Sequence, residues 1–432
     1  MAWIKTEWEN MLGGLWFVPG CVAAAYGLLA IVLTSVEAGR GQTGGNFGFT
    51  GSANIAGTLL STIAGSLITV TGLALSLTIV TVQLVSGQFT PRAIGNFLGD
   101  RGIQLITGAL IGTFAYCLLV LRVLRASGDG HAAFVPSVSI SLAIVLSLGA
   151  IGLLVVFVHR VSQMIQVNNI VRSIAHVTLH SVDRTYPDGY RQADDGAAPA
   201  PRSGATESGG TRVSPTKMGY VRRIDVDAMV AAAPSGARIT VLVPRGSFVT
   251  ENATIATVTG EETTARAVRR SVTVAADRHL ANDPGFGLQQ LSDIALRALS
   301  PGINDPRTAL TCIFYLQAVM ERLVTREIPR GVQIDTGRDV MITVRQDDFA
   351  DMIEVAFGAV GRYASADAGV AVALLEAIGA VAQHATAHGA GGRAAALRAV
   401  AIEVAATASS KADWPSDKGR IANALQDLRL KT

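Results

Sequence analysis

Four long apolar stretches occupy the first third of the chain. They run over residues 15–36, 58–87, 103–123 and 135–158, with polar or glycine-rich segments between them. An α-helix needs about 20 apolar residues to cross the hydrocarbon core of a bilayer, and each stretch reaches that length. The pattern predicts an α-helical membrane domain with four transmembrane helices over residues 1–158.

The second apolar stretch carries small and hydroxyl-bearing residues at helical spacing. Positions three and four apart lie on one stripe of a helix, and this stripe consists of Thr62, Gly65, Thr69, Gly72, Ser76 and Gln83. One interpretation is close packing between helices through small residues. The other is a pore that several subunits line with hydroxyl groups and exposed glycine backbone. No charged residue interrupts the stretch, which disfavours a proton relay or a transporter of charged substrates.

Basic residues around the predicted spans are unevenly distributed. One side of the membrane would hold Lys5, Arg92, Arg101, Arg160 and Arg172, and the other would hold Arg40, Arg122 and Arg125. Cytoplasmic segments of membrane proteins carry the excess of lysine and arginine. The bias predicts a multi-pass protein of the bacterial plasma (inner) membrane with both termini in the cytoplasm.

The rest of the chain changes its pattern several times. Residues 159–186 continue as a helical extension, and residues 187–216 are rich in Pro, Gly, Ser and Ala, which is typical of a flexible linker. Clustered β-branched residues over 217–275 predict strands. The stretch "VPRGSFVTENATIATV" at 243–258 is similar to half a biotinyl/lipoyl-type module, a resemblance that implies a small β-barrel-sandwich-like domain over 217–275. Residues 276–432 are expected to form a mainly helical cytoplasmic domain, so this region is α+β in class.

Composition excludes several classes of function. Charged residues make up 16% of the chain, below the roughly 25% of soluble domains. The net charge of +3 is too small to indicate a nucleic-acid partner. Cys21, Cys117 and Cys312 are too scattered for a disulfide framework or a zinc cluster. We therefore expect no metal and no cofactor.

The sequence offers little support for an enzyme. It contains no Walker loop, HExxH, GxSxG or zinc-type Cys/His spacing, and no pairing of a nucleophile with a base is apparent. Missing motifs are weak evidence, so an enzyme stays the third interpretation. We assign no catalytic residues.

The stretch "LSPGINDP" at residues 299–306 interrupts a region with a helical pattern. Pro301 ends the preceding helix, and Gly302 is suited to a positive φ in the turn. Asp305 is a good N-cap, and Pro306 suits the first position of the next helix. Local chemistry therefore predicts a corner between two helices.

Charged residues surround this corner. Asp293 and Arg297 are spaced to pair along one helix, and Arg307 sits at a helix start, where the dipole disfavours a cation. The cluster of Asp293, Arg297, Asn304, Asp305 and Arg307 has two interpretations. It is either a structural set of ion pairs or a site for a small anionic ligand, because helix N-termini bind anions.

Two motifs carry a resemblance to a known family. The stretch "FGLQQLSDIALRALSPGINDPRTA" at 286–309 closely resembles a signature of the bacterial predicted membrane proteins called domain of unknown function 2254. Residues 59–122 are also similar to that family. The resemblance spans nearly the whole chain. It implies a membrane topology and supplies no activity.

The leading hypothesis is an oligomeric, channel-like conduit for small ions or solutes with a cytoplasmic assembly or regulatory domain. Its expected partners are the lipid bilayer and further copies of the chain. The alternative is a membrane-anchored cytoplasmic sensor or scaffold that binds a small anion without conduction.

Overall fold

The chain forms two compact units, Met1–Val167 and Asn168–Thr432. They are seen in a computed structural model. The residues it describes are 16–40, 49–88, 101–124, 134–164, 166–189, 210–259, 262–278, 280, 283–328, 331–335 and 340–430. Each unit is described by itself below.

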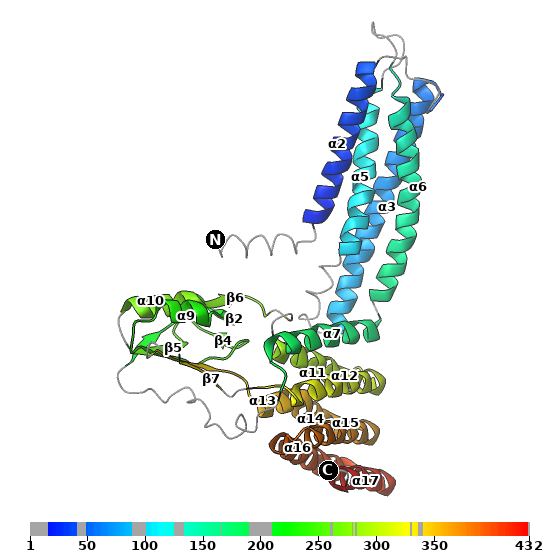
Figure 1. The fold of residues 1–432 in the computed structure, drawn as a ribbon. Coiled ribbons are helices and arrows are strands. Elements are labelled where there is room, and N and C mark those ends of the chain that lie inside the picture. Colours follow the sequence, from blue (N-terminus) through cyan, green and yellow to red (C-terminus); the bar gives the residue numbers. More distant parts are fainter. Residues whose placement is uncertain are drawn as a thin grey trace. The chain divides into compact units, whose positions relative to one another are not determined.

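The N-terminal unit is a bundle of long apolar helices (Figure 1). They are α2 (Phe17–Arg40), α3 (Ala53–Gln88), α5 (Arg101–Val123) and α6 (Ser137–Met164). Helix α5 packs against the other three and is the most buried of them. All four helices are long and apolar enough to cross a membrane.

Two glycines bring α5 close to α2. A Cβ at Gly108 would lie 2.9 Å from Cα of Pro19, and one at Gly112 would lie 2.8 Å from Cγ of Tyr26. Neither position has room for a side chain. The GxxxG spacing is the one that lets membrane helices approach through their backbones.

A carboxylate ties α2 to α6 at one end of the bundle. Glu37 of α2 accepts hydrogen bonds from the backbone N–H groups of Val138 (2.8 Å) and Ser139 (3.0 Å) and from the Ser139 hydroxyl. An acidic group at a helix N-terminus satisfies free N–H donors and favours the dipole. The Tyr116 hydroxyl of α5 donates to the Ser139 carbonyl at 3.0 Å, so three helices meet here.

The C-terminal unit begins with the amphipathic helix α7 (Val167–Thr185) and continues into two small sheets. The five-stranded sheet has the order β1-β5-β3-β8-β7, and the three-stranded sheet has the order β4-β2-β6. The strands are β1 (Thr211–Val213), β2 (Gly219–Ile224), β3 (Arg238–Val241), β4 (Phe248–Val249), β5 (Ala256–Thr259), β6 (Val272–Ala275), β7 (Gly331–Asp335) and β8 (Met341–Arg345). Two helices, α9 (Val226–Ala232) and α10 (Glu262–Ser271), accompany them.

The predicted β-barrel-sandwich-like closure was wrong. Within the described residues both sheets stay open, with β1 and β7 at the edges of one and β4 and β6 at the edges of the other. The reason lies in β8, which pairs in parallel with β3 and so occupies the edge that a closing barrel would use. Ile342 and Val344 of β8 are buried in the sheet core.

Two strands come from unexpected places in the sequence. Strand β8 is separated from β3 by nearly a hundred residues of chain, yet its register with β3 runs from Arg238↔Met341 to Val241↔Val344. Strand β1 comes from the segment predicted to be a linker and pairs with β5. Residues 190–209 of that predicted linker lie outside the described residues.

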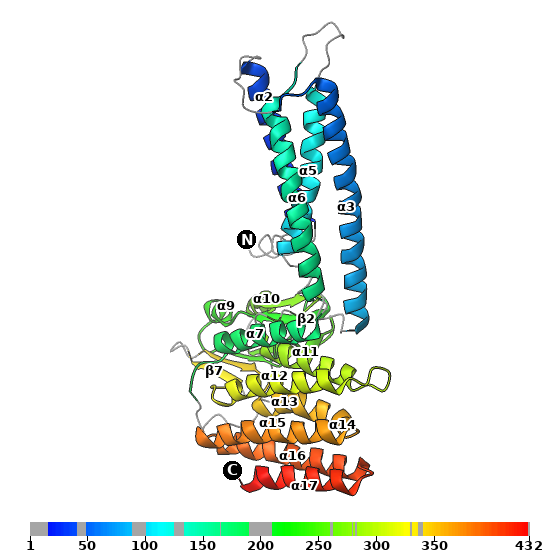
Figure 2. The same cartoon turned by 90° about the vertical axis from the view of Figure 1, so that its right-hand side faces the viewer.

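The remaining helices stack in layers, which Figure 2 shows most clearly. They are α11 (Pro284–Ala298), α12 (Pro306–Val324), α13 (Phe349–Ile353), the π-helix η4 (Glu354–Gly358), α14 (Ala359–Ala364), α15 (Ala368–Ala387), α16 (Gly391–Lys411) and α17 (Pro415–Leu430). Arg393 of α16 is almost fully buried and joins these layers. Its guanidinium donates to the carbonyls of Leu323 (3.2 Å), Val324 (2.9 Å) and Arg326 (2.7 Å), which satisfies the C-terminal end of α12.

The described residues contain five helices that meet the length and apolarity of a membrane span, so the predicted count of four is not confirmed. The fifth is α15, which lies in the C-terminal unit and packs against α12, α16 and α17. A helix that is surrounded by protein is apolar on all sides. Composition therefore does not distinguish α15 from a transmembrane helix, and neither does its buried share of 56%, which is below the 67% of α5. The two helices differ in their partners, because α2, α3 and α6 are themselves among the five, whereas α12, α16 and α17 are not.

Candidate functional site

The predicted stripe on α3 faces away from the rest of its own bundle. All six of its residues are exposed: Thr62, Gly65, Thr69, Gly72, Ser76 and Gln83. The face that packs within the chain is lined by Ala56, Leu60, Ala64, Leu67, Thr71 and Ala74. Thr62 follows Leu60 by two residues, which is about half a helical turn. The stripe is thus on the opposite side of α3 from its intrachain contacts.

Small residues on the stripe do not serve packing inside the bundle. A Cβ added at Gly65 or Gly72 would meet no atom within 4 Å, in contrast to Gly108 and Gly112 of α5. The backbone of α3 is therefore accessible at both positions. Close packing through this stripe would require a neighbour from outside the described chain.

The hydroxyl groups of the stripe are oriented by their own helix. The Thr62 hydroxyl donates to the Thr58 carbonyl at 2.8 Å, and the Thr69 hydroxyl donates to the Gly65 carbonyl at 2.9 Å. Each donor is satisfied, and the remaining lone pairs of each oxygen are available as acceptors. The stripe therefore offers acceptor oxygens without any formal charge.

An open hollow of about 600 Å³ lies at the first three turns of α3. Its wall consists of Ala53, Asn54, Gly57, Thr58, Ser61, Thr62 and Leu124. Thr62 belongs to both the hollow and the stripe. Polar side chains thus continue from the stripe to the end of the helix.

At the α11–α12 corner the chain turns as the local sequence predicts, with one difference. Asp305 caps α12 by accepting from the N–H of Thr308 (3.1 Å) and its hydroxyl (2.6 Å). These bonds, led by the one from the Thr308 hydroxyl, lower the pKa of Asp305. The positive φ falls on Asn304 (47°), so the prediction of Gly302 was wrong. Asparagine tolerates this conformation because its short polar side chain bonds locally.

The charged residues predicted around the corner are only partly brought together. Asp293 and Arg297 lie one turn apart on α11, both half-buried and both engaged in polar interactions. Arg307 points to an exposed surface at the start of α12. Asp305 already supplies a carboxylate to the α12 N-terminus, where a bound anion would otherwise sit.

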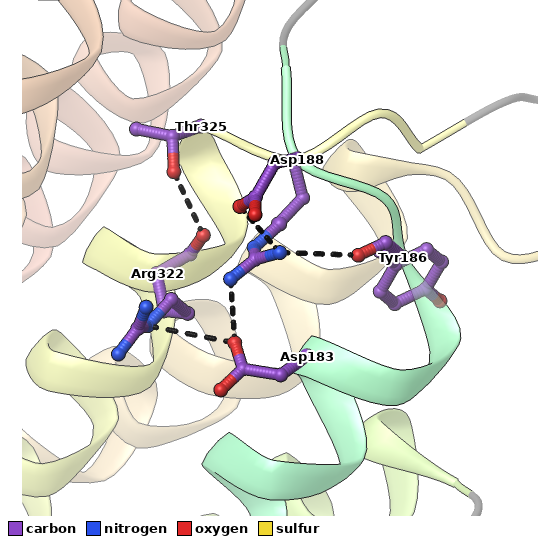
Figure 3. A network of polar contacts seen from close by, with 6 residues as sticks. Asp183, Tyr186, Asp188, Arg322 and Thr325 are labelled. Atoms are coloured by element: carbon purple, nitrogen blue, oxygen red, sulfur yellow. Dashed lines mark hydrogen bonds and ion pairs between the residues drawn. The ribbon is translucent and has the colours of Figure 1, made fainter.

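A buried arginine clasps the end of α7 to the end of α12 (Figure 3). Arg326 is 5% exposed and pairs with Asp183 and with Asp188, each at 2.5 Å. Its guanidinium also donates to the backbone carbonyl of Tyr186 at 3.4 Å, while Arg322 reaches Asp183 at 3.7 Å. We call this set the Arg326 clasp. It fixes the backbone on both sides of Tyr186.

Beside the clasp lies a cavity of about 90 Å³ that sequence reasoning missed. It is lined by Thr185, Tyr186, Ile224, Val226, Pro244, Arg245, Asp283, Pro284, Gly285, Val344, Arg345, Gln346, Asp347 and Met352. These residues come from five separated parts of the chain. No local spacing in the sequence would have grouped them.

Ionisable groups inside the cavity are strongly influenced by burial. Burial raises the pKa of Asp347 to about 6, with further contributions from the neighbouring charges of Asp351 and Asp283. Burial likewise raises the pKa of the Tyr186 hydroxyl. Asp283 differs from Asp347 in that it has a direct ion-pair partner, Arg278, at 2.8 Å. Perturbed carboxyls in a cavity are typical of binding and catalytic sites.

Among the described residues, no group of three or more His, Cys, Asp or Glu side chains has the geometry of a metal site. The donors present in the cavity do not form such a group either. The charged and polar side chains that line the cavity can form ion pairs and hydrogen bonds with a ligand.

Together, the bundle of long apolar helices and the α+β unit define a membrane protein with several apolar helices, a small sheet region and a helical C-terminus. The chain belongs to the family described as predicted membrane protein (DUF2254), whose sequence model matches residues 13–380. This match confirms the resemblance seen in the two motifs.

Relatives with similar sequences occur in mycobacteria. An uncharacterized protein of Mycobacterium tuberculosis (strain H37Rv) is 30% identical over 394 residues, which is 88% of this chain and 74% of the relative. An uncharacterized protein of Mycobacterium bovis matches with the same identity and coverage. No solved structure matches the chain.

Proposed function

We propose that the protein is a homo-oligomeric, channel-like conduit for small ions or solutes, in which α3 helices from several subunits surround the path. The observation that carries this proposal is the stripe from Thr62 to Gln83, which is exposed opposite the packed face of α3. Hydroxyl groups and bare glycine backbone are better accommodated against protein or water than against lipid tails.

The chemistry of the stripe suits uncharged or weakly charged cargo. Thr62 and Thr69 direct acceptor oxygens outward, and the stripe contains no formal charge. Acceptor oxygens replace part of the hydration shell of a small cation and also bind water. The hollow at Asn54 and Thr58 would serve as the entrance at one end.

The distribution of basic residues supports an orientation with both termini in the cytoplasm of a bacterial inner membrane. In this arrangement the C-terminal unit is the cytoplasmic assembly or regulatory domain. The alternative, a sensor that binds a small anion at the α11–α12 corner without conduction, has less support. Asp305 already occupies the α12 N-terminus that would attract an anion.

Flux through reconstituted protein tests the proposal. The purified full-length protein in liposomes is expected to pass K⁺ or a small neutral solute such as glycerol. Thr69→Leu and Ser76→Leu should each lower the flux by about tenfold or more, because apolar side chains dewet a narrow path. Leu77→Ile is the matched control, since Leu77 is an exposed apolar residue of the same helix outside the stripe.

Flux equal to that of protein-free liposomes would rule out the conduit. The same conclusion would follow if the Thr69→Leu and Ser76→Leu variants conducted as well as the Leu77→Ile control.

A further inference from the structure

The cavity beside the Arg326 clasp plays no part in the proposed conduit. None of its lining residues belongs to α3 or to the turn between α11 and α12. Its charged lining consists of Arg245, Asp283, Arg345 and Asp347. A site with this lining therefore needs its own explanation.

Three of these four charges have no direct partner in the part of the chain that the structure describes. Asp283 is paired with Arg278 and caps α11 through the N–H of Phe286. By contrast, the side chains of Arg245, Arg345 and Asp347 form no direct hydrogen bond or ion pair with the described residues. Asp347 has Arg278 and Arg345 as neighbouring positive charges, which lower its pKa but do not offset the effect of burial. Arg345 and Asp347 are half-buried, whereas Arg245 is exposed at the rim of the cavity. Half-buried charges without a direct partner are costly, and a ligand of complementary charge removes that cost.

The polar groups of the cavity wall are held in place by the surrounding fold. Tyr186 is 7% exposed, its ring lines the cavity, and its hydroxyl forms no hydrogen bond within the described residues. The Arg326 clasp fixes its backbone. Gly285 leaves space next to the carboxylates, since a Cβ there would lie 3.6 Å from Asp283 Oδ1 and 3.8 Å from Asp347 Oδ2. The site is thus largely formed before any ligand arrives.

The volume sets the size of the ligand. A single water needs about 15 Å³ when volume is measured in this way, so about 90 Å³ holds roughly six water-sized positions. That space suits a molecule of a few non-hydrogen atoms. Two positive groups and one negative group are complementary to a ligand that carries both signs of charge.

We propose that this cavity binds a small zwitterion of the α-amino acid type, with its ammonium group against Asp347 and its carboxylate against Arg245 and Arg345. The Tyr186 hydroxyl donates a further hydrogen bond to the bound carboxylate. A bound zwitterion would connect the end of α7 with β8 and the start of α11, and so join three parts of the C-terminal unit. The site does not depend on conduction by α3.

Isothermal titration calorimetry of the full-length protein in detergent at pH 8 tests the proposal. The probes are glycine, L-alanine and L-serine as zwitterions, methylamine for the ammonium group alone and acetate for the carboxylate alone. At least one zwitterion should bind more tightly than both half-ligands. Asp347→Asn and Arg345→Gln should each weaken its binding by about tenfold or more, because each removes a charge-assisted hydrogen bond.

Two further variants separate binding from folding. Gly285→Leu adds a side chain inside the cavity without changing any charge and should abolish binding. Asp277→Asn removes an exposed carboxylate that does not line the cavity, and it should bind as the unmodified protein does. Thermal unfolding of each variant shows whether it is folded.

Three results would overturn the proposal. The first is that no zwitterion binds. The second is that methylamine or acetate binds as tightly as the best zwitterion, which would indicate a site for a single charge. The third is that folded Asp347→Asn keeps the full affinity for that zwitterion.

Discussion

At the residue scale, the fold changes the pKa of the Asp347 carboxyl. Its pKa is raised to about 6, mainly by burial, whereas an unfolded aspartate has a pKa near 4. The folded state therefore binds this proton more tightly than the unfolded state. The stability that the group contributes is fully present below about pH 4 and is lost as pH rises through about 6.

Replacing this carboxyl by an amide should therefore stabilise the protein at high pH. Without ligand at pH 8, Asp347→Asn is expected to increase the free energy of unfolding by on the order of 1–3 kcal/mol, because the amide never ionises. At pH 5 the difference should be much smaller. Thermal unfolding in detergent at both pH values measures it. A variant that is less stable than the unmodified protein at pH 8 would show that Asp347 is a structural ion-pair partner instead.

At the element scale, the glycines of α5 and α3 have opposite roles. Gly108 and Gly112 touch α2, whereas Gly65 and Gly72 have free space around them. Gly108→Leu should destabilise the bundle by about 2 kcal/mol or more, since overpacking forces the helices apart. Gly65→Leu should leave the thermal stability of a single chain unchanged and alter the oligomeric state, as measured by native mass spectrometry. Equal loss of stability in both variants would contradict this assignment.

The same scale shows how far the sequence predicts structure. The helices around 299–306 follow from local chemistry, because Pro301, Asp305 and Pro306 act on their immediate neighbours. The positive φ was assigned to Gly302 and lies at Asn304 instead, since either residue tolerates it. The parallel pairing of β8 with β3 and the cavity around Asp347 depend on contacts between distant segments. No periodicity along the chain encodes such contacts.

At the scale of the whole molecule, apolar composition alone leaves the number of membrane spans open. Helix α15 has 20 residues, or about 30 Å, which is enough to cross a bilayer. Yet its residues Leu374, Leu375 and Ile378 are fully buried, and it packs on three other helices of the C-terminal unit. Placing α15 in lipid would break this core.

Topology is therefore expected to follow the four helices of the N-terminal unit, so that Val167 and Thr432 lie on the same side of the membrane. Green fluorescent protein fused after either residue should fluoresce, because it folds only in the cytoplasm. Fusion after Arg40, at the end of α2, is the matched control and should be dark. Alkaline phosphatase fusions at the three positions should show the reverse pattern. If α15 crossed the membrane, the Thr432 fusion would report the opposite side from the Val167 fusion, and the C-terminal core would have to be assembled differently.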